Sequence, residues 1–313
     1  MSKIAEKSKN VNLQIAFPFL GLAAVLLFFQ IATGGRLFTS QNLKAVLNDG
    51  LYIIIGAAGY AFMFAMGLLD FSIGANMAVS CAVACLAAKI NPWLSIPAAI
   101  LTGMFLAGIL GTIHVKGNVN AFITTLAGQF IFKGLVLIVL NNSVQQAPLV
   151  MLKWFTLPLK ISLLLVTVIV GYLVFEYSVY GKTCKLIGSC EEAARQTGIQ
   201  VGKHKMCGFL VMGAIAGLLG FISLIRTGTA SSQTGSSLMM NVLNAALLGG
   251  LPLSGGPTTK FRGVIVGSLT MSFLTSGMTI MGYNVNTQQL VKGAIFLIAI
   301  SISFDRKNMK VIK

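Results

Sequence analysis

Acidic residues are scarce in this chain: seven Asp and Glu stand against 23 Lys and Arg among 313 residues, and only 10% of residues are charged. Apolar residues make up 56% of the sequence. A water-soluble domain of this length carries far more charged surface, so the composition indicates an integral membrane protein. The net charge of +16 is scattered between apolar runs without a basic face or interleaved aromatic residues, which argues against nucleic-acid binding.

Cysteine is also sparse, and the five cysteines show no paired spacing of a disulfide framework. Cys81 and Cys85 lie one helical turn apart in an apolar segment with no His or carboxylate cluster nearby. We therefore expect them to be small packing residues, and we predict no metal site.

The motifs of an enzyme are missing as well. Gly181-Lys182-Thr183 resembles the end of a phosphate-binding loop, but the earlier glycine that such a loop needs would fall at Glu176. His114 and His204 are isolated, and no nucleophile is paired with a base. We predict a chain with no catalytic residue, no bound cofactor and no ATP hydrolysis of its own.

Long apolar runs are what the chain has in abundance. A bilayer core of about 30 Å needs about 20 apolar residues as helix, and helices are the spans that satisfy their own backbone. The apolar stretch 51–90 is twice that length and is broken only at Asp70 to Gly74, so we place a turn at Asp70. We expect the first span to remain in the mature protein, because it is too long for a cleaved signal peptide. The ten predicted spans are 13–33, 51–69, 72–88, 94–113, 121–140, 161–177, 207–225, 238–253, 263–281 and 288–303.

The distribution of Lys and Arg predicts the orientation. With ten spans and the N-terminus inside, fifteen basic residues lie in inner segments and six in outer segments. Because basic residues favour cytoplasmic loops, we expect both termini and the segment 180–206 to lie in the cytoplasm. The two remaining basic residues, Lys133 and Lys292, fall within spans.

The two halves of the chain share a weak sequence similarity. Gln129 to Gly134 resembles Gln288 to Gly293 at an offset of 159, which also superposes Gly108 on Gly267. Five spans in each half would make the halves inverted repeats, an arrangement common in transporters, although chance matches explain the similarity equally well. Glycines spaced four apart, as at Gly213 and Gly217, predict close intramolecular helix packing rather than dimerisation.

The segment 180–206 is a charged interruption of this apolar chain. It predicts one exposed helix that Ser189 caps, with Glu191 and Glu192 in the first turn, Arg195 four residues after Glu191, and Gly198 at the end. A helix this short is marginal alone in water, so we expect it to dock onto a partner; the alternative is a solvated loop.

Five short motifs occur along the chain: Glu191-Glu-Ala-Ala-Arg195-Gln-Thr-Gly198-Ile199, Leu69-Asp70-Phe-Ser72-Ile-Gly74, Ala121-Phe-Ile-Thr-Thr-Leu126, Leu247 to Gly256, and Leu290-Val-Lys292-Gly293. Together they resemble the motifs of ABC importer permeases of the ribose, xylose and galactose group. The resemblance covers the chain from about residue 40 onward, and departures at Gly67-Leu68 and Leu251-Pro252 bear on the substrate and on symmetric homodimerisation.

This resemblance implies an all-α type II importer permease: a single transmembrane domain, 1–313, with a coupling loop at 180–206. It implies a bacterial inner-membrane location, a second permease subunit, a cytoplasmic ATPase that binds ATP and magnesium, and an extracytoplasmic binding protein that delivers a ribose-like sugar. The residues expected to couple to the ATPase are Glu191, Glu192, Ala193, Ala194, Arg195, Gly198 and Ile199. Alternatives are a permease for branched-chain amino acids or nucleosides, and a secondary transporter, for which only Asp70 and Glu176 come near to ion-coupling carboxylates.

Polar residues in or near the spans are candidates for the translocation path. Asp70 either caps the third span at its cytoplasmic edge, through the N–H groups of Ser72 and Ile73, or faces the path. Lys133 either faces the path, pairs internally or extends to the outer surface, whereas Lys292 is expected to extend to that surface. Threonine and asparagine side chains could contact a polyol or bond between helices. The candidate set is Asp70, Ser72, Gly74, Asn120, Thr124, Thr125 and Lys133.

Overall fold

The computed structural model describes residues 18–252 and 254–303, and helices make up most of this part of the chain. The α-helices are Pro18–Ala32, α2 Ser40–Ala65, α3 Ile73–Ile90, α4 Ser95–Gly117, α5 Ala121–Val139, α6 Leu157–Glu176, α7 Val179–Ser189, α8 Glu191–Gln196, α9 Val201–Thr227, α10 Leu238–Leu248, α11 Phe261–Ile280 and α12 Val285–Ser303. Short 3-10 helices lie at Arg36–Phe38, Pro92–Leu94 and Leu149–Trp154, and strands β1 Gln145–Gln146 and β2 Thr229–Ala230 pair antiparallel.

The all-α prediction is confirmed, and each of the ten predicted spans contains a helix. Within the described residues, seven helices are long and apolar enough to cross a membrane, while Pro18–Ala32 and α10 are shorter. The count of ten spans stays a prediction. Residues 13–17 of the first predicted span lie outside the described residues.

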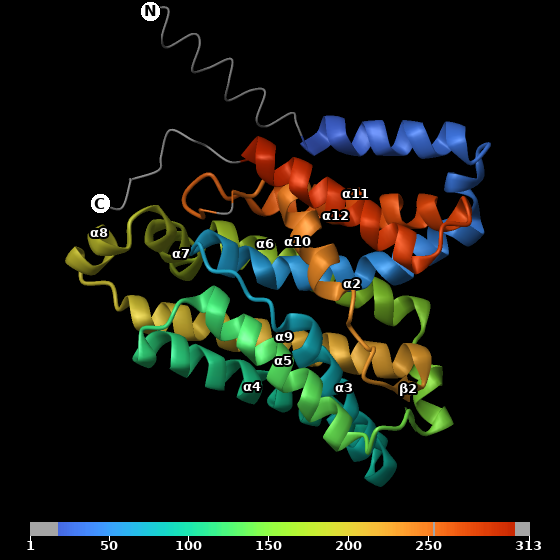
Figure 1. Ribbon diagram of the computed structural model, residues 1–313, viewed down its shortest axis with the longest axis horizontal. Helices are drawn as coiled ribbons and strands as arrows, with labels where there is room; N and C mark the ends of the chain where they lie inside the picture. The colour runs from blue at the N-terminus through green and yellow to red at the C-terminus, as the bar shows by residue number, and fades with distance from the viewer. Residues whose placement is uncertain (1–17, 253, 304–313) are drawn as a thin grey trace, which may run out of the picture.

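The loops sort to two opposite ends of the bundle (Figure 1). At one end, the Phe261 N–H donates to the Glu176 carboxylate (2.8 Å) and the Gly256 N–H donates to the Ala65 carbonyl (2.9 Å). At the other end, β1 pairs with β2, and the rings of Trp93 and Trp154 lie 4.7 Å apart. Which of these two ends faces the cytoplasm stays a prediction.

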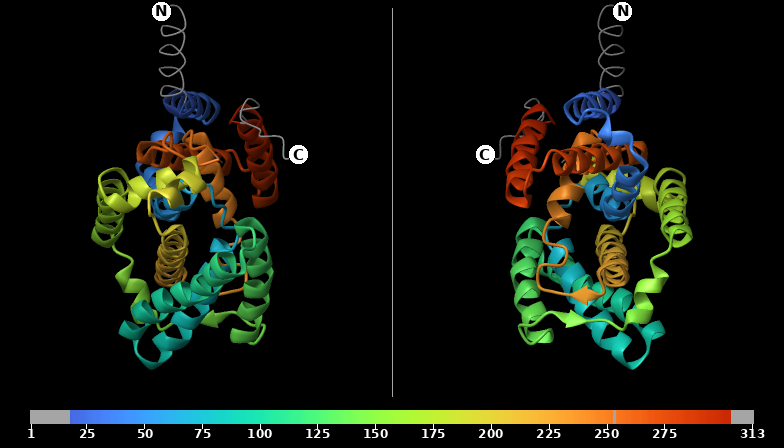
Figure 2. Two further views of the ribbon diagram at one scale, coloured as in Figure 1. Left: turned by 90° about the vertical axis from the view of Figure 1, so that its left-hand side faces the viewer. Right: turned by 90° about the vertical axis from the view of Figure 1, so that its right-hand side faces the viewer.

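The contacts of the second half repeat those of the first. Helix α9 lies at the centre of the bundle (Figure 2) and packs on α3 and α4, just as α2 packs on α10 and α11. Gly56 of α2 faces Val242 of α10, and Gly220, which lies 164 positions after Gly56, faces Met77 of α3. The packing of α2, α3 and α4 is therefore repeated by α9, α10 and α11, while a repeat of five spans stays a prediction. The sequence similarity at an offset of 159 is out of register with this packing repeat by about one helical turn.

Glycine lets several of these helices touch through their backbones. A Cβ at Gly213 or Gly217 of α9 would collide with the carbonyl oxygens of Gly103 and Ala99 on α4. The predicted intramolecular packing is confirmed at this pair. Cys81 and Cys85 are buried within α3, as packing residues should be.

Two helices begin inside the bundle, each after a non-helical linker. Helix α10 has 11 residues, and at 1.5 Å per residue it covers only about half of a 30 Å bilayer core. The predicted span at 238–253 would therefore need linker 231–237 to cover the remaining depth between β2 and α10, and linker 66–72 leads from α2 to α3 in the same way (Figure 1). Linker 231–237 touches the first turn of α3, where a Cβ at Gly74 would lie 2.6 Å from the Gly235 carbonyl oxygen.

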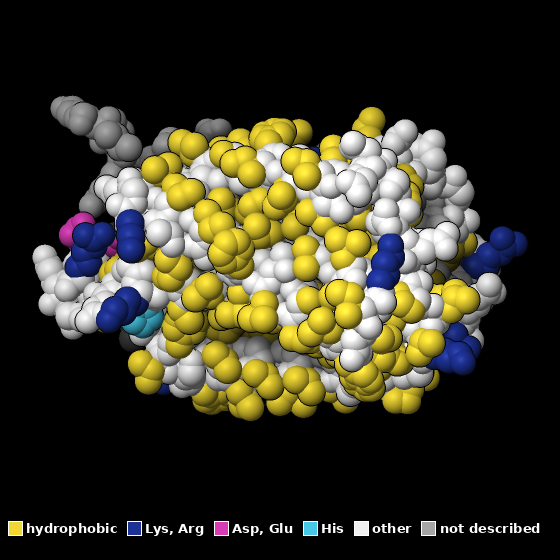
Figure 3. Space-filling model, turned by 90° about the horizontal axis from the view of Figure 1, so that it is seen from below, with side chains coloured by type: hydrophobic (Ala, Val, Ile, Leu, Met, Phe, Trp, Pro, Cys, Tyr) yellow, Lys and Arg dark blue, Asp and Glu magenta, His cyan; other side chains and the backbone are white. Residues whose placement is uncertain are grey.

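Hydrophobic side chains cover much of the molecular surface between the two ends, as Figure 3 shows for one face. Helix α6 is an extreme case, with exposed Leu165, Val166 and Ile169 among its residues. An apolar belt of this kind is the surface that lipid requires of a spanning protein.

Candidate coupling site and translocation path

The charged segment forms two helices, α7 and α8, where the sequence predicted one helix capped by Ser189. That prediction is wrong because Ser189 is the last residue of α7. Cys184 and Ile187 are buried, which holds α7 on the bundle through this point, and the extended backbone of Cys190 then separates it from α8. Gly198, with φ of 81°, follows α8 and ends it as predicted.

Glu191 at the start of α8 holds this helix by two ion pairs. Its Oε1 accepts from Arg195 and its Oε2 from Lys205 of α9, both at 2.8 Å. The pairing with Arg195 was predicted, whereas Lys205, fourteen residues away, gave no short-range signal. The Lys205 pair is partly screened by solvent and contributes up to about 1 kcal/mol.

These two cations also control the ionisation of Glu191. Partial burial raises the pKa of Glu191, but the hydrogen bonds and charges of Lys205 and Arg195 outweigh burial and hold the pKa below its usual value. The stabilisation is therefore present at neutral pH and is lost only as the pH falls through this lowered pKa.

The predicted coupling residues divide between two faces of α8. Glu191, Ala194 and Ile199 turn toward the bundle, and Ala194 is completely buried. The outward face, called the docking surface below, consists of Glu192, Ala193, Arg195 and Gly198, all of which are exposed.

Glu176, a carboxylate that the sequence offered for ion coupling, instead uses both of its oxygens in bonds within the chain. One oxygen pairs with Lys185 of α7, and the other accepts the N–H of Phe261, the first residue of α11. It thus ties the ends of α6, α7 and α11 together.

Glycines bring three segments into backbone contact beside α7. A Cβ at Gly188 would collide with the Ala65 carbonyl oxygen, the same oxygen to which Gly256 donates. Gly255, with φ of 73°, lies against Gly67 at the start of linker 66–72. The sequence motif that ends in Gly255-Gly256 was noted, but its contact with α2 and α7 was not foreseen.

Asp70 lies inside the bundle and not at its edge. It is 2% exposed, and its Oδ1 accepts from the Ser72 N–H (2.7 Å) and the Ser72 hydroxyl (2.6 Å). Its backbone N–H and carbonyl both bond to the Tyr60 hydroxyl. The predicted bond to Ser72 is confirmed, but the predicted edge position is wrong, because Tyr60 lies more than one turn before the end of α2.

The polar residues at the start of α5 are already engaged within the chain. The Asn120 side chain caps α5 by accepting from the Phe122 N–H (2.9 Å), and the Thr124 hydroxyl donates to the Asn120 carbonyl (3.0 Å). Thr125 bonds to the Ala121 carbonyl (2.9 Å) and to the Leu69 carbonyl (3.2 Å). Thr125 therefore fastens linker 66–72 to α5.

The two lysines within spans differ. Lys133 is exposed on the outer surface of α5. Lys292 is only 5% exposed, so the prediction that it extends to the surface is wrong. Its backbone carbonyl accepts from Asn244 (3.1 Å), which shows that this part of α12 packs against α10.

Sequence reasoning missed linker 231–237. Its sequence, Ser-Ser-Gln-Thr-Gly-Ser-Ser, has six hydroxyl or amide side chains between two apolar helices, a signal that was available. Gln233 and Ser236 are exposed, and the other residues are partly exposed.

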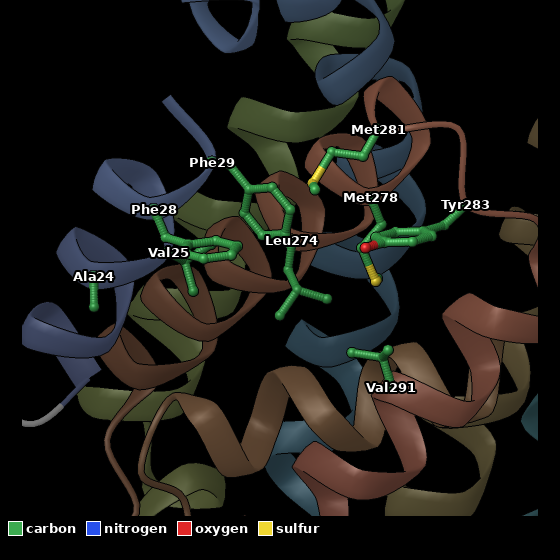
Figure 4. Close-up of a pocket in the computed structure, with 9 residues that line it drawn as sticks. All are labelled: Ala24, Val25, Phe28, Phe29, Leu274, Met278, Met281, Tyr283 and Val291. Atoms are coloured by element: carbon green, nitrogen blue, oxygen red, sulfur yellow. The ribbon is translucent and has the colours of Figure 1, made fainter. Parts of the chain in front are cut away.

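One apolar cavity of about 410 Å³ lies between Pro18–Ala32, α11 and the start of α12 (Figure 4). Phe28, Phe29, Leu274 and Met278 are among its lining residues, and Tyr283 is also there. Such a lining does not suit a polyol. Among the described residues, no three His, Cys, Asp or Glu side chains gather as metal ligands.

Comparison with known proteins gives a consistent result. The family described as "Branched-chain amino acid transport system / permease component" matches residues 42–300. The ribose import permease protein RbsC of Escherichia coli (strain K12) is 26% identical over 90% of this chain and 92% of its own length. The L-arabinose transport system permease protein AraH of the same strain is 30% identical over 86% and 85%. The xylose transport system permease protein XylH of Haemophilus influenzae is 24% identical over 96% and 99%. No solved structure matches the chain.

Proposed function

The chain belongs to the family of branched-chain amino acid transport system permease components, and on that premise we propose that it imports a neutral monosaccharide. It is a multi-pass permease of the inner membrane and a transport subunit of an ABC importer, not an enzyme. The sugar assignment is supported by the relatives, whose names give ribose, xylose and arabinose.

The partners follow from this role. An ABC importer permease works with an ATPase and a binding protein. We propose that the ATPase, with its ATP and magnesium, docks on α8 from the cytoplasm, and that both termini lie on that side. We also propose that a second permease subunit completes the path and that the binding protein delivers the sugar from outside.

The observation that carries this proposal is the division of α8 into an anchored face and an exposed docking surface. Coupling requires an element that a moving partner can push without displacing it from the bundle. Glu191 holds α8 to α9 through Lys205, while Arg195 and Glu192 remain accessible.

Charge reversal on the docking surface tests the ATPase contact. Arg195→Glu should abolish co-purification of the ATPase and sugar uptake, while Arg195→Lys should restore both. The matched control is Lys116→Glu, which reverses an exposed cation on a different element, α4. If Arg195→Glu and Lys116→Glu behave alike, the docking surface is wrongly placed.

Substrate class is tested by uptake in cells that carry the permease with its ATPase and binding protein. Labelled ribose, xylose and arabinose should accumulate in an ATP-dependent manner, and leucine should not compete. The family description favours one alternative, a permease for branched-chain amino acids, and ATP-dependent uptake of leucine would establish it.

A further inference from the structure

Linker 231–237 crosses part of the membrane depth without helical structure. Helix α10 is too short to span, and β2 places the start of the linker at the end of the bundle where β1 lies. Backbone of this kind is tolerated at membrane depth only where protein buries it or where it lines a water-filled cavity.

Protein does not bury this linker. Gln233 and Ser236 are exposed, whereas the counterpart residues of linker 66–72, such as Leu68 and Asp70, are 7% and 2% exposed. A polar, partly exposed segment cannot face lipid, so it faces water.

Most polar side chains of the linker have no partner within the described chain. Thr234 bonds to Ser231, but Ser232, Gln233, Ser236 and Ser237 make no side-chain hydrogen bond there. Their hydroxyl and amide groups can each donate and accept, which is the capacity that a polyhydroxylated solute requires.

The first turn of α10 adds a second, independent observation. The Asn241 Oδ1 is buried without a hydrogen-bond partner among the described residues. Its counterpart, Asn76, lies 165 positions earlier and is satisfied, because it donates to the Gly103 carbonyl (3.1 Å) and accepts from Ser80 (3.4 Å). A buried polar atom that lacks a partner is costly, so Asn241 requires one that the described residues do not supply.

The charge of this region restricts the solute. The linker contains no ionisable residue. Arg226 near the same end is paired with Asp49 (2.7 Å), and Lys292 is only 5% exposed. Arg226 and Asp49 balance each other's charge, and the linker itself offers a charged solute no counter-ion, whereas a neutral one needs none.

We propose that linker 231–237 and Asn241 line the translocation path and contact a neutral polyhydroxylated solute through Gln233 and Ser236. This inference rests on the proposed function and adds to it the element that the sugar touches. The alternative is that a second permease subunit packs on the linker and shields it from water, and the labelling experiment below decides between the two.

Thiol labelling tests the exposure of the linker in the assembled importer. Gln233→Cys and Ser236→Cys, in intact cells with the ATPase and binding protein present, are treated with a membrane-impermeant methanethiosulfonate. The control Leu165→Cys places a thiol on the exposed apolar face of α6, and the parent chain gives the background of its own cysteines. We expect both linker cysteines to react at least about tenfold faster than Leu165→Cys, because only the linker faces water. Labelling no faster than this control would overturn the inference.

Uptake tests the contact with the solute. The double variant Gln233→Leu with Ser236→Ala should lower sugar uptake about tenfold through lost hydrogen bonds, with membrane level and ATPase co-purification unchanged. Unchanged uptake by this variant would overturn the contact while the parent's sugar transport stands. If the parent takes up leucine and no sugar, the proposed function fails, and the labelling rates still decide whether the linker lines the path.

Discussion

The two linkers solve the same problem in opposite ways. Each interrupts helical structure inside the bundle, yet linker 66–72 is mostly buried and bonded while linker 231–237 is partly exposed and its side chains are mostly unbonded. Tyr60 and Thr125 hold the first by three hydrogen bonds to its backbone. In the second, local turns and Thr234, which bonds to Ser231 and to Cys81 of α3, supply the bonds.

The difference shows how repeated halves can take different tasks. In the first half, protein satisfies the irregular backbone, so this linker serves as a rigid part of the bundle. In the second half, water or solute must satisfy the polar groups, so this linker can serve transport. The comparison predicts that stability depends on the first linker and uptake on the second.

The largest effect is expected where linker 231–237 packs against the first turn of α3, which directly follows linker 66–72. Gly74→Val would place a branched side chain where even a Cβ lies 2.6 Å from the Gly235 carbonyl oxygen. We expect a loss of roughly 3 kcal/mol or more in folding stability, measured by thermal denaturation in detergent. The control Gly134→Val has open space around it and should be close to neutral. A Gly74→Val protein as stable as the parent would show that Gly74 and Gly235 are not in close contact.

The second-largest loss of folding stability is expected from removal of the Tyr60 hydroxyl. Tyr60→Phe leaves the buried N–H and carbonyl of Asp70 without their shared partner, at a cost of about 2–4 kcal/mol. Tyr283→Phe, which changes a tyrosine that is 44% exposed, serves as the control in the same denaturation assay. Equal stability of the two variants would mean that linker 66–72 is not held as described.

A smaller loss is expected at the bond between α5 and the first linker. Thr125→Val keeps the shape of the side chain but removes its bond to the Leu69 carbonyl, at a cost of about 1 kcal/mol. Thr112→Val removes an exposed hydroxyl from α4 and should cost less. Denaturation curves that rank these two variants in the reverse order would argue against this fastening.

The smallest stability effect is expected in the second linker. Ser236→Ala and Gln233→Ala remove groups that bond to nothing in the described chain, so stability should change by no more than about 0.5 kcal/mol. Uptake by the same variants should nevertheless fall. A stability loss as large as that of Tyr60→Phe would make the two linkers equivalent and remove the basis for their separate tasks.

Local patterns predicted the features of the fold that depend on local physics. Apolar runs located the helices, and the spacing of Glu191 and Arg195 predicted an ion pair. The sequence could not reveal Lys205 as a partner of Glu191, Phe261 as a partner of Glu176, or the burial of Lys292, because each depends on helices that meet only in the folded bundle. Linker 231–237 was readable as a polar run, but its importance follows only once α10 proves too short to span.

The contact of Gly188 with Ala65 has a mechanical consequence. No side chain separates α7, the end of α2 and the loop at Gly256, so rotamer changes cannot absorb a displacement of one against the others. A movement of α8 that is passed into α7 would therefore also act on the C-terminal end of α2 at Ala65. The glycine contacts thus connect α7 rigidly to the end of α2. Linker 66–72, which carries Asp70, continues directly from that end.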